Sequence, residues 1–202
     1  MSIGRYLALA GLAFALTACT LLPQAEPVQV YLLPAASLPP ASTTKIDRAL
    51  RISRPRASMI LSSTRIAVIP AGSQLSSYKG ARWSDEAPAL LRDRLVELFI
   101  DDGRFTTVSS DDQHLLTDLD LQGSLAAFQA EYRNGRPVVV IRYDAHLASS
   151  GSQRILASRR FEVHQPSDGE QLEAVVAAFG QASERLARQL IDWTATQAAA
   201  GR

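Results

Sequence analysis

Few residues of this 202-residue chain have the types and the spacing that catalysis requires. Ser76 and Lys79 form the short S-x-x-K pattern of penicillin-binding enzymes, in which the serine is the nucleophile. The S-D-N and K-T-G motifs that accompany this pattern are missing from the sequence. Both residues also fall in segment 71–83, which is rich in Gly and Ser and which we expect to be a loop. Chance therefore explains the pattern better than acyl transfer does.

The three histidines, His114, His146 and His164, could in principle act as general bases or metal ligands. We expect them in a loop and in two strands, and no histidine or cysteine pair has the spacing of a zinc site. His146 and His164 could share the outer face of a sheet, where solvated surface is the better interpretation. The G-x-S-x-G, G-x-G-x-x-G and Walker A motifs are also absent. The sequence therefore predicts no catalytic residue, no metal site, no cofactor and no enzyme.

The one cysteine, Cys19, stands in a context that predicts covalent modification. Arg5 and the apolar run 6–16 form a signal peptide that is too short to span a bilayer. Immediately after it, the sequence Leu-Thr-Ala-Cys at 16–19 resembles a bacterial lipobox. We therefore expect removal of residues 1–18 and attachment of diacylglycerol and an N-acyl chain, such as palmitate, to Cys19. The alternative is that Cys19 is an ordinary small residue inside a cleaved signal peptide.

The expected anchor also predicts a compartment. Two or three acyl chains hold a protein stably on a membrane, whereas one chain does not. Thr20 rather than Asp follows the cysteine, and by resemblance to lipoproteins of two-membrane envelopes this favours the periplasmic face of the outer membrane. Because Cys19 is the sole cysteine, no disulfide can form within the chain, and the fold must be held by packing.

Charge and composition exclude several classes of protein. The 21 basic and 20 acidic residues give a net charge of +1, which supplies no cationic field for binding nucleic acid. A hydrophobic content of 47% excludes a disordered chain. We expect a single domain at 45–202 and, before it, a Pro-rich tether at 19–44. The alternating segment 28–33 is expected to be a short edge strand within that tether.

Hydrophobic patterning predicts the elements of the first half of the domain. Segments 49–53, 64–69 and 105–108 are expected to be strands. A helix is expected to begin at Ser84 or Asp85, with Pro88 in its first turn, and to end at Gly103. Its buried stripe comprises Leu91, Leu95, Leu98 and Phe99. Asp101 and Asp102 are expected to be solvated charges near Arg104, and a cation site there is the weaker alternative.

Three long alternating segments, 118–132, 137–148 and 154–164, predict an antiparallel meander. Asn134-Gly135 is the preferred dipeptide of a type I′ turn and sets the register of the first hairpin. In that register Leu119, Leu121 and Leu125 would face solvent, so we expect a one-residue bulge near 126–127 that turns them inward.

In the second hairpin, cross-strand charge favours the register that sets Arg142 opposite Glu162 and Asp144 opposite Arg160. This register implies a three-residue loop, 151–153.

A last amphipathic segment predicts a long helix. It is expected to begin at a capping box formed by Ser167 and Glu170 and to run for about thirty residues, about 45 Å. Its apolar stripe comprises Leu172, Val175, Val176, Phe179, Ser183, Leu186, Leu190 and Ile191. The expected fold class is therefore α+β: a mostly antiparallel sheet, made of the meander and N-terminal strands, covered by two helices of which the C-terminal one is long.

In their order and spacing, several segments resemble the ABC-type transport auxiliary lipoproteins. These segments are the lipobox, Val30-Tyr31-Leu32-Leu33-Pro34, the strand Arg65–Ile69, Tyr78, the run Ala81–Pro88 that leads into a Leu-rich helix, and Gly103-Arg104-Phe105. The resemblance covers almost the whole chain after the signal peptide, although no single motif is diagnostic. Ala87 stands where proline is more usual before Pro88, which affects no functional residue.

The resemblance implies a non-enzymatic periplasmic component of a lipid transport system. Such proteins work beside the permease and ATPase of an ABC transporter and beside MCE-domain proteins, which move hydrophobic molecules between the inner and outer membranes. We expect a docking or gating subunit at the outer membrane, which could form a homo-oligomeric ring. The alternative is a periplasmic carrier that shields a lipid in its own apolar cavity. The mid-sized residues on the inner faces favour docking.

The segment 72–83 is the best candidate for a surface that contacts a partner or a lipid head group. Tyr78 and Trp83 place large amphipathic side chains near the cations of Lys79 and Arg82. The alternative, which we favour for Trp83, is that this side chain fills the core under the first helix.

Overall fold

The computed structural model describes residues 27–35 and 45–200. Within them, nine strands, two α-helices and one short 3₁₀ helix follow one another along the chain. In order, these are β1 (Gln29–Tyr31), β2 (Ile46–Ile52), β3 (Arg56–Ala57), β4 (Arg65–Ile69), β5 (Ser76–Trp83), α2 (Ala87–Asp102), β6 (Phe105–Ser110), η1 (Asp111–Gln113), β7 (Leu119–Arg133), β8 (Arg136–Ser149), β9 (Ile155–Pro166) and α3 (Leu172–Ala200). No helix in these two ranges is long and apolar enough to cross a membrane.

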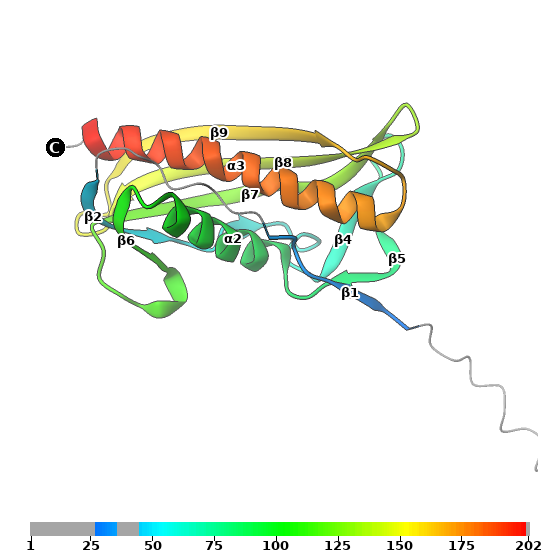
Figure 1. Ribbon diagram of the computed structural model, residues 1–202, viewed down its shortest axis with the longest axis horizontal. Coiled ribbons are helices and arrows are strands. Elements are labelled where there is room, and N and C mark those ends of the chain that lie inside the picture. The colour runs from blue at the N-terminus through cyan, green and yellow to red at the C-terminus, as the bar shows by residue number, and fades with distance from the viewer. Residues whose placement is uncertain (1–26, 36–44, 201–202) are drawn as a thin grey trace, which may run out of the picture.

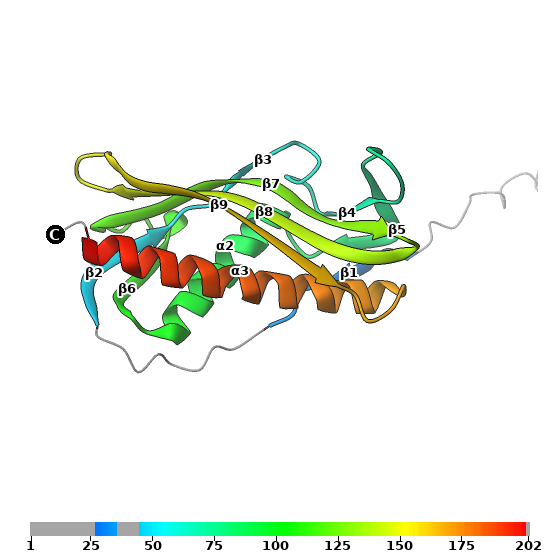
Figure 2. The ribbon, with the colours of Figure 1, turned by 90° about the horizontal axis from the view of Figure 1, so that it is seen from above.

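The strands form one long, curled sheet, and both helices lie on the same face of it (Figures 1 and 2). The expected α+β class with a long C-terminal helix is therefore confirmed. The long ladders β7–β8 and β8–β9 are antiparallel, as in a meander. The strands β2, β3 and β4 each pair with β7 in parallel, an arrangement that the sequence did not indicate.

The meander confirms most of the expected register. Asn134 and Gly135 form the turn with positive φ angles of 52° and 78°, as a type I′ turn requires. The ladder β7–β8 shifts by one residue between Leu125 and Ala127, so the predicted bulge is present and the β7 leucines are buried. Leu125 lies opposite Tyr143, as expected.

The β8–β9 hairpin has the register that cross-strand charge predicted, but its loop differs from the predicted one. Arg142 pairs with Glu162 and Asp144 with Arg160. The predicted three-residue loop is wrong, because the amide of Ser149 donates to the carbonyl of Arg154 and residues 150–153 form the connection. A second irregularity between Leu147 and Ala148 absorbs the difference.

The first helix, α2, buries its expected stripe but starts later than expected. Glu86, not Ser84 or Asp85, occupies the N-cap position, and its side chain makes no capping bond but pairs with Arg54. Gly103 ends the helix at a φ of 70°, as predicted. Asp102 is buried and not solvated, since Arg104 donates to it with a Nε–Oδ1 distance of 2.7 Å.

The second helix, α3, begins at Leu172, so the predicted start at Ser167 is wrong. The Ser167 hydroxyl bonds to the carbonyl of Gly169 instead of capping the helix. The rest of the prediction is confirmed: except for the half-buried Leu172, the stripe is buried against the sheet and α2.

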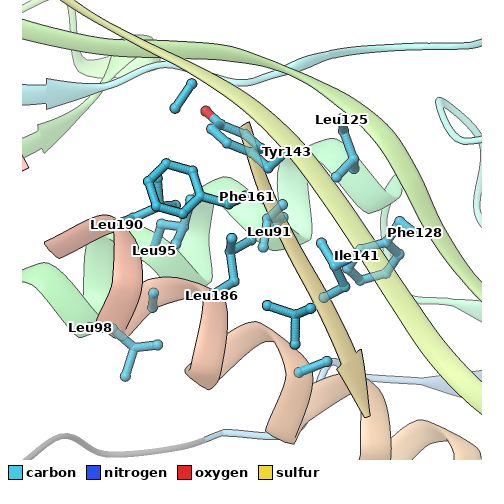
Figure 3. Packing of buried hydrophobic residues seen from close by; sticks show 14 of the residues in the cluster. Leu91, Leu95, Leu98, Leu125, Phe128, Ile141, Tyr143, Phe161, Leu186 and Leu190 are labelled. Carbon is cyan, nitrogen blue, oxygen red and sulfur yellow. The ribbon is translucent and has the colours of Figure 1, made fainter. Parts of the chain in front are cut away.

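One continuous core fills the space between the helices and the sheet. Figure 3 shows leucines of α2 and α3 meeting aromatic rings and aliphatic side chains of the meander. The labelled residues are Leu91, Leu95, Leu98, Leu125, Phe128, Ile141, Tyr143, Phe161, Leu186 and Leu190, all buried. Tyr143 lies against Gly123, where a Cβ atom would stand 2.5 Å from its Cζ. The sheet therefore needs glycine at this point.

Candidate functional site

The predicted lipidation site Cys19, its neighbour Thr20 and most of the predicted tether lie outside the described residues. The described part of that segment, residues 27–35, packs on the domain. The amide of Ser84 donates to the carbonyl of Tyr31 (2.8 Å), and the Tyr31 hydroxyl donates to Glu173 of α3 (2.9 Å). Leu33 is buried and accepts a hydrogen bond from Arg94 of α2. The chain is therefore held to both helices from Tyr31 onward.

The residues that could suggest catalysis are not brought together. Ser76 and Lys79 lie in strand β5, although we expected a loop, and residues three apart in a strand point to opposite faces. His146 bonds to the hydroxyl of Ser158 (2.8 Å), and His164 to Glu162 (2.7 Å). Within the described ranges, no three His, Cys, Asp or Glu side chains cluster as a metal site would require.

Trp83 occupies the core rather than a surface. Its ring is completely buried and meets Phe179 at a centroid distance of 5.2 Å and Phe128 at 6.2 Å, both edge-on. Its indole Nε1 is buried without a hydrogen-bond partner. The core role that the sequence favoured for Trp83 is therefore the one that the structure shows, and the side chain is closed to a partner.

The other three predicted surface residues, Tyr78, Lys79 and Arg82, lie at different places along strand β5. Tyr78 is half-buried beside Tyr132, and its burial raises the pKa of the phenol above its ordinary value. Lys79 is exposed next to Gly80, whose φ of 67° marks an irregular stretch of the strand. Arg82 is exposed on the sheet face opposite to Trp83.

Arg82 lies at the centre of a surface that sequence analysis did not define. Val30 of β1 pairs with it on one side and Arg65 of β4 on the other, so the three side chains share one face. Val28 and Leu32 flank Val30 on the same side of the chain, with exposed fractions of 53%, 52% and 73% for Val28, Val30 and Leu32. We call these five residues, Val28, Val30, Leu32, Arg65 and Arg82, the edge patch.

The outer face of the meander carries ordinary cross-strand ion pairs. Arg142 donates to both oxygens of Glu162 at 2.9 and 3.0 Å, and Arg160 donates to Asp144 at 2.5 and 2.9 Å. Arg142 and His164 together lower the pKa of Glu162 to about 2. These four charged side chains are paired with one another, so the two ion pairs give no sign of a catalytic group.

An open hollow of about 460 Å³ lies on that face and is lined mostly by polar side chains. Its lining comprises Ser124, Asp144, Ala145, His146, Ser158, Arg159 and Arg160. Six of its seven lining residues carry polar or charged groups, whereas an acyl chain needs an enclosed apolar cavity.

Comparison with models of known protein families shows which family the chain belongs to. The model of the ABC-type transport auxiliary lipoprotein component matches residues 31–191, which include every described helix and strand except most of β1 and the end of α3. The chain belongs to this family. The match spans the edge patch from Leu32 onward, and it spans both helices and the meander.

Solved structures share the fold of this auxiliary lipoprotein. A crystal structure of a Xanthomonas campestris protein is 30% identical and superposes with a TM-score of 0.80, covering 86% of this chain and 98% of that one. A second, uncharacterized protein of known structure shares the fold at 17% identity, with a TM-score of 0.68 over 84% of this chain and 99% of its own.

One curated relative was found in Bradyrhizobium diazoefficiens, an uncharacterized protein that is 29% identical over 164 residues. The alignment covers 78% of this chain but only 42% of the relative, so the auxiliary lipoprotein spans less than half the length of that protein.

Proposed function

We propose that this chain is a non-enzymatic subunit of an ABC/MCE-type lipid transport system, docking or gating the assembly at the periplasmic face of the outer membrane. The family match over residues 31–191 carries the proposal, because it assigns the domain to the auxiliary lipoproteins of ABC-type transport. The partners would be an MCE-domain protein and the permease and ATPase of the transporter. The unclustered polar residues described above are consistent with a role in binding rather than in catalysis.

The anchor in this proposal is Cys19. It is the only cysteine of the chain and directly follows the apolar run of the signal peptide. Metabolic labelling with a palmitate analogue tests it: the wild-type protein should incorporate the label and Cys19→Ser should not. Incorporation into Cys19→Ser would remove the lipoprotein anchor from the proposal.

The outer-membrane address rests on Thr20. Thr20→Asp should retain the protein in the inner membrane, as an acidic residue does in resembling lipoproteins, whereas Thr20→Ser serves as the matched control. Membrane fractionation by density measures the outcome. An outer-membrane distribution of Thr20→Asp identical to that of the wild type would contradict this basis for sorting.

Docking is favoured over a lipid-carrying role by the packing between the helices and the sheet. The largest side chains there, among them Trp83, Phe128 and Phe179, are less than 2% exposed and touch one another. A carrier needs an apolar cavity of several hundred cubic ångströms, about 300 or more. Native mass spectrometry of the mature protein should therefore find no bound lipid besides the covalent acyl chains, and the same spectra report the number of subunits. Stoichiometric co-purifying phospholipid would favour the carrier.

A further inference from the structure

We propose that the edge patch lies against the phospholipid head groups of the membrane to which the chain is anchored, with Arg65 and Arg82 on lipid phosphates and Val28, Val30 and Leu32 at the head-group–acyl boundary. The inference rests on the proposed function only through the anchor at Cys19. Three observations support it. Arg65 and Arg82 lie opposite one another, Val28, Val30 and Leu32 are exposed beside them, and only a short segment of chain separates Val28 from Cys19.

The two arginines form a like-charge pair across the sheet. Arg65 and Arg82 are direct partners in the antiparallel ladder β4–β5, so their side chains leave the same face next to one another. Like charges directly opposite destabilise a sheet. Among the described residues, no carboxylate forms an ion pair or hydrogen bond with either guanidinium, whereas the matched arginines Arg142 and Arg160 on β8 and β9 both have one.

This repulsion is relieved when an anion binds between the two guanidinium groups. Arginine binds phosphate through two parallel N–H donors, which makes it the preferred residue for this group. The pair is therefore suited to a phosphodiester rather than to a further cation.

The apolar side of β1 lies directly beside the arginines. Val30 pairs with Arg82, and Val28 and Leu32, just outside the two ends of β1, are exposed as well. Charged and apolar side chains side by side, on a surface that is otherwise solvated, are the pattern of proteins that lie in a membrane interface.

The chain length places this patch near the bilayer. Val28 is the ninth residue after Cys19, and an extended chain of nine residue steps reaches about 30 Å at most. From Tyr31 on, the chain is held by Ser84, Glu173 and Arg94, and a Cβ at Gly180 of α3 would stand 2.9 Å from the Cβ of Pro34. The patch therefore begins at the first described residues after the anchor, where β1 pairs with β5 at the edge of the sheet (Figure 1).

The opposite end of β7 provides a control surface. β4 joins β7 at Ala130 and Glu131, near its C-terminal end, whereas Leu116 precedes the N-terminal end of the same long strand. Leu116 is 98% exposed, so it is as accessible as Leu32 but is separated from the patch by the length of the sheet.

Photo-cross-linking in cells tests the proposal with the full-length, anchored protein. p-Benzoylphenylalanine is introduced at Leu32 or at Leu116, phospholipids are labelled with radioactive phosphate, and adducts are compared with and without irradiation. Diacylglycerol on Cys19 carries no phosphate, so lipidation itself adds no label. We expect a phosphate-labelled adduct at position 32 that is at least about fivefold stronger than at 116. Equal labelling at the two positions, or a protein adduct as the main product at 32, would overturn the proposal.

Charge variants test the role of the arginines. Arg65→Glu/Arg82→Glu keeps a like-charge pair but repels phosphate, and it should reduce the lipid adduct at position 32 several-fold. Arg65→Lys/Arg82→Lys keeps the positive charge, so this variant should retain most of the lipid adduct at position 32. An unchanged adduct in the double-glutamate variant would refute phosphate binding by these residues. Thermal unfolding of each purified variant shows that the fold is intact.

The outcome separates this inference from the proposed function. A chain that gives the lipid adduct but co-purifies with no transporter subunit leaves the edge patch in place and removes the docking role. A chain that co-purifies with the transporter but gives no lipid adduct at position 32 overturns the edge patch alone.

Discussion

Arg82 and Arg160 are both exposed arginines on strands, and they differ in the residue that each one faces. Arg82 lies opposite Arg65, whereas Arg160 lies opposite Asp144. A cross-strand pair of opposite charges contributes about 0.2–1 kcal/mol and a like-charge pair opposes folding. The edge patch therefore holds a pair of side chains that reduces the stability of the sheet.

The first prediction follows from this contrast. Arg82→Glu places a carboxylate opposite Arg65 and should raise the free energy of unfolding by roughly 0.5 kcal/mol. Arg160→Glu places a carboxylate opposite Asp144 and should lower it by a similar amount. Chemical denaturation of the two variants measures both effects. A loss of stability in Arg82→Glu equal to that in Arg160→Glu would contradict the opposed arrangement of Arg65 and Arg82.

The second prediction concerns Trp83, which packs edge-on against Phe128 and Phe179. Trp83→Ala leaves a cavity in the core and should lower the free energy of unfolding by about 3–5 kcal/mol. Trp83→Phe should cost much less, because the indole N–H makes no hydrogen bond that would be lost. Lys79→Ala, at an exposed position of the same strand, should change stability by less than about 0.5 kcal/mol. A small effect of Trp83→Ala would show that the ring is not part of the core.

At the scale of elements, the β7 bulge determines which side of the strand faces the helices. Ala126 is the extra residue between the pairs Leu125–Tyr143 and Ala127–Arg142. Deletion of Ala126 would turn Leu119, Leu121 and Leu125 toward solvent, so we expect the variant not to fold cooperatively. Deletion of Gly151 in the exposed β8–β9 connection is the control and should leave a cooperative transition. Circular dichroism during heating distinguishes the two, and cooperative unfolding of the Ala126 deletion near the wild-type temperature would contradict the register.

The pairing of β8 with β9 predicts a pH dependence. Hydrogen bonds from Arg142 and His164 lower the pKa of Glu162 to about 2, below its value of about 4.3 in an unfolded chain. A carboxyl group with a lowered folded pKa stabilises the protein above the unfolded pKa, and this contribution is lost as the pH falls toward the folded one. Glu162→Gln should therefore lower stability at about pH 6 and have a smaller effect near pH 3. Urea unfolding at both pH values measures the difference, and an effect that grows on acidification would reverse the assigned sign.

Local patterning was sufficient to predict the meander and insufficient for the N-terminal strands. The Asn134-Gly135 turn and the parity of the β7 leucines fix side-chain direction within neighbouring segments, so the register followed. The parallel pairing of β2, β3 and β4 with β7 depends on contacts between distant segments, which no local pattern encodes.

The edge patch was predictable only where it depends on a local sequence pattern. The alternation of Val28, Val30 and Leu32 indicated an edge strand and could have indicated its apolar side. The position of Arg65 opposite Arg82 was not predictable, because the β4–β5 ladder is irregular between Arg65 and Ala67. Cys19 was recognised from its spacing to the signal peptide alone, and its acylation stays a prediction.

At the scale of the whole molecule, the long helix α3 and the meander give the domain two distant ends. Twenty-nine helical residues extend about 43 Å at 1.5 Å per residue. The edge patch lies at the end formed by β1, β4 and β5, and the loop with Leu116 lies toward the end formed by β2 and β6 (Figure 1). In the proposed arrangement the first end rests on the membrane, and the second is left for a partner in the periplasm.

The central claim is that this auxiliary lipoprotein works as part of a transport assembly at the membrane. Its most direct test is affinity purification of the tagged full-length protein from cells after mild cross-linking, with the bound proteins identified by mass spectrometry. The account predicts enrichment of an MCE-domain protein together with the permease and ATPase of one ABC transporter. Failure to recover any MCE-domain or ABC-transporter subunit above the level seen with an unrelated outer-membrane lipoprotein would contradict it.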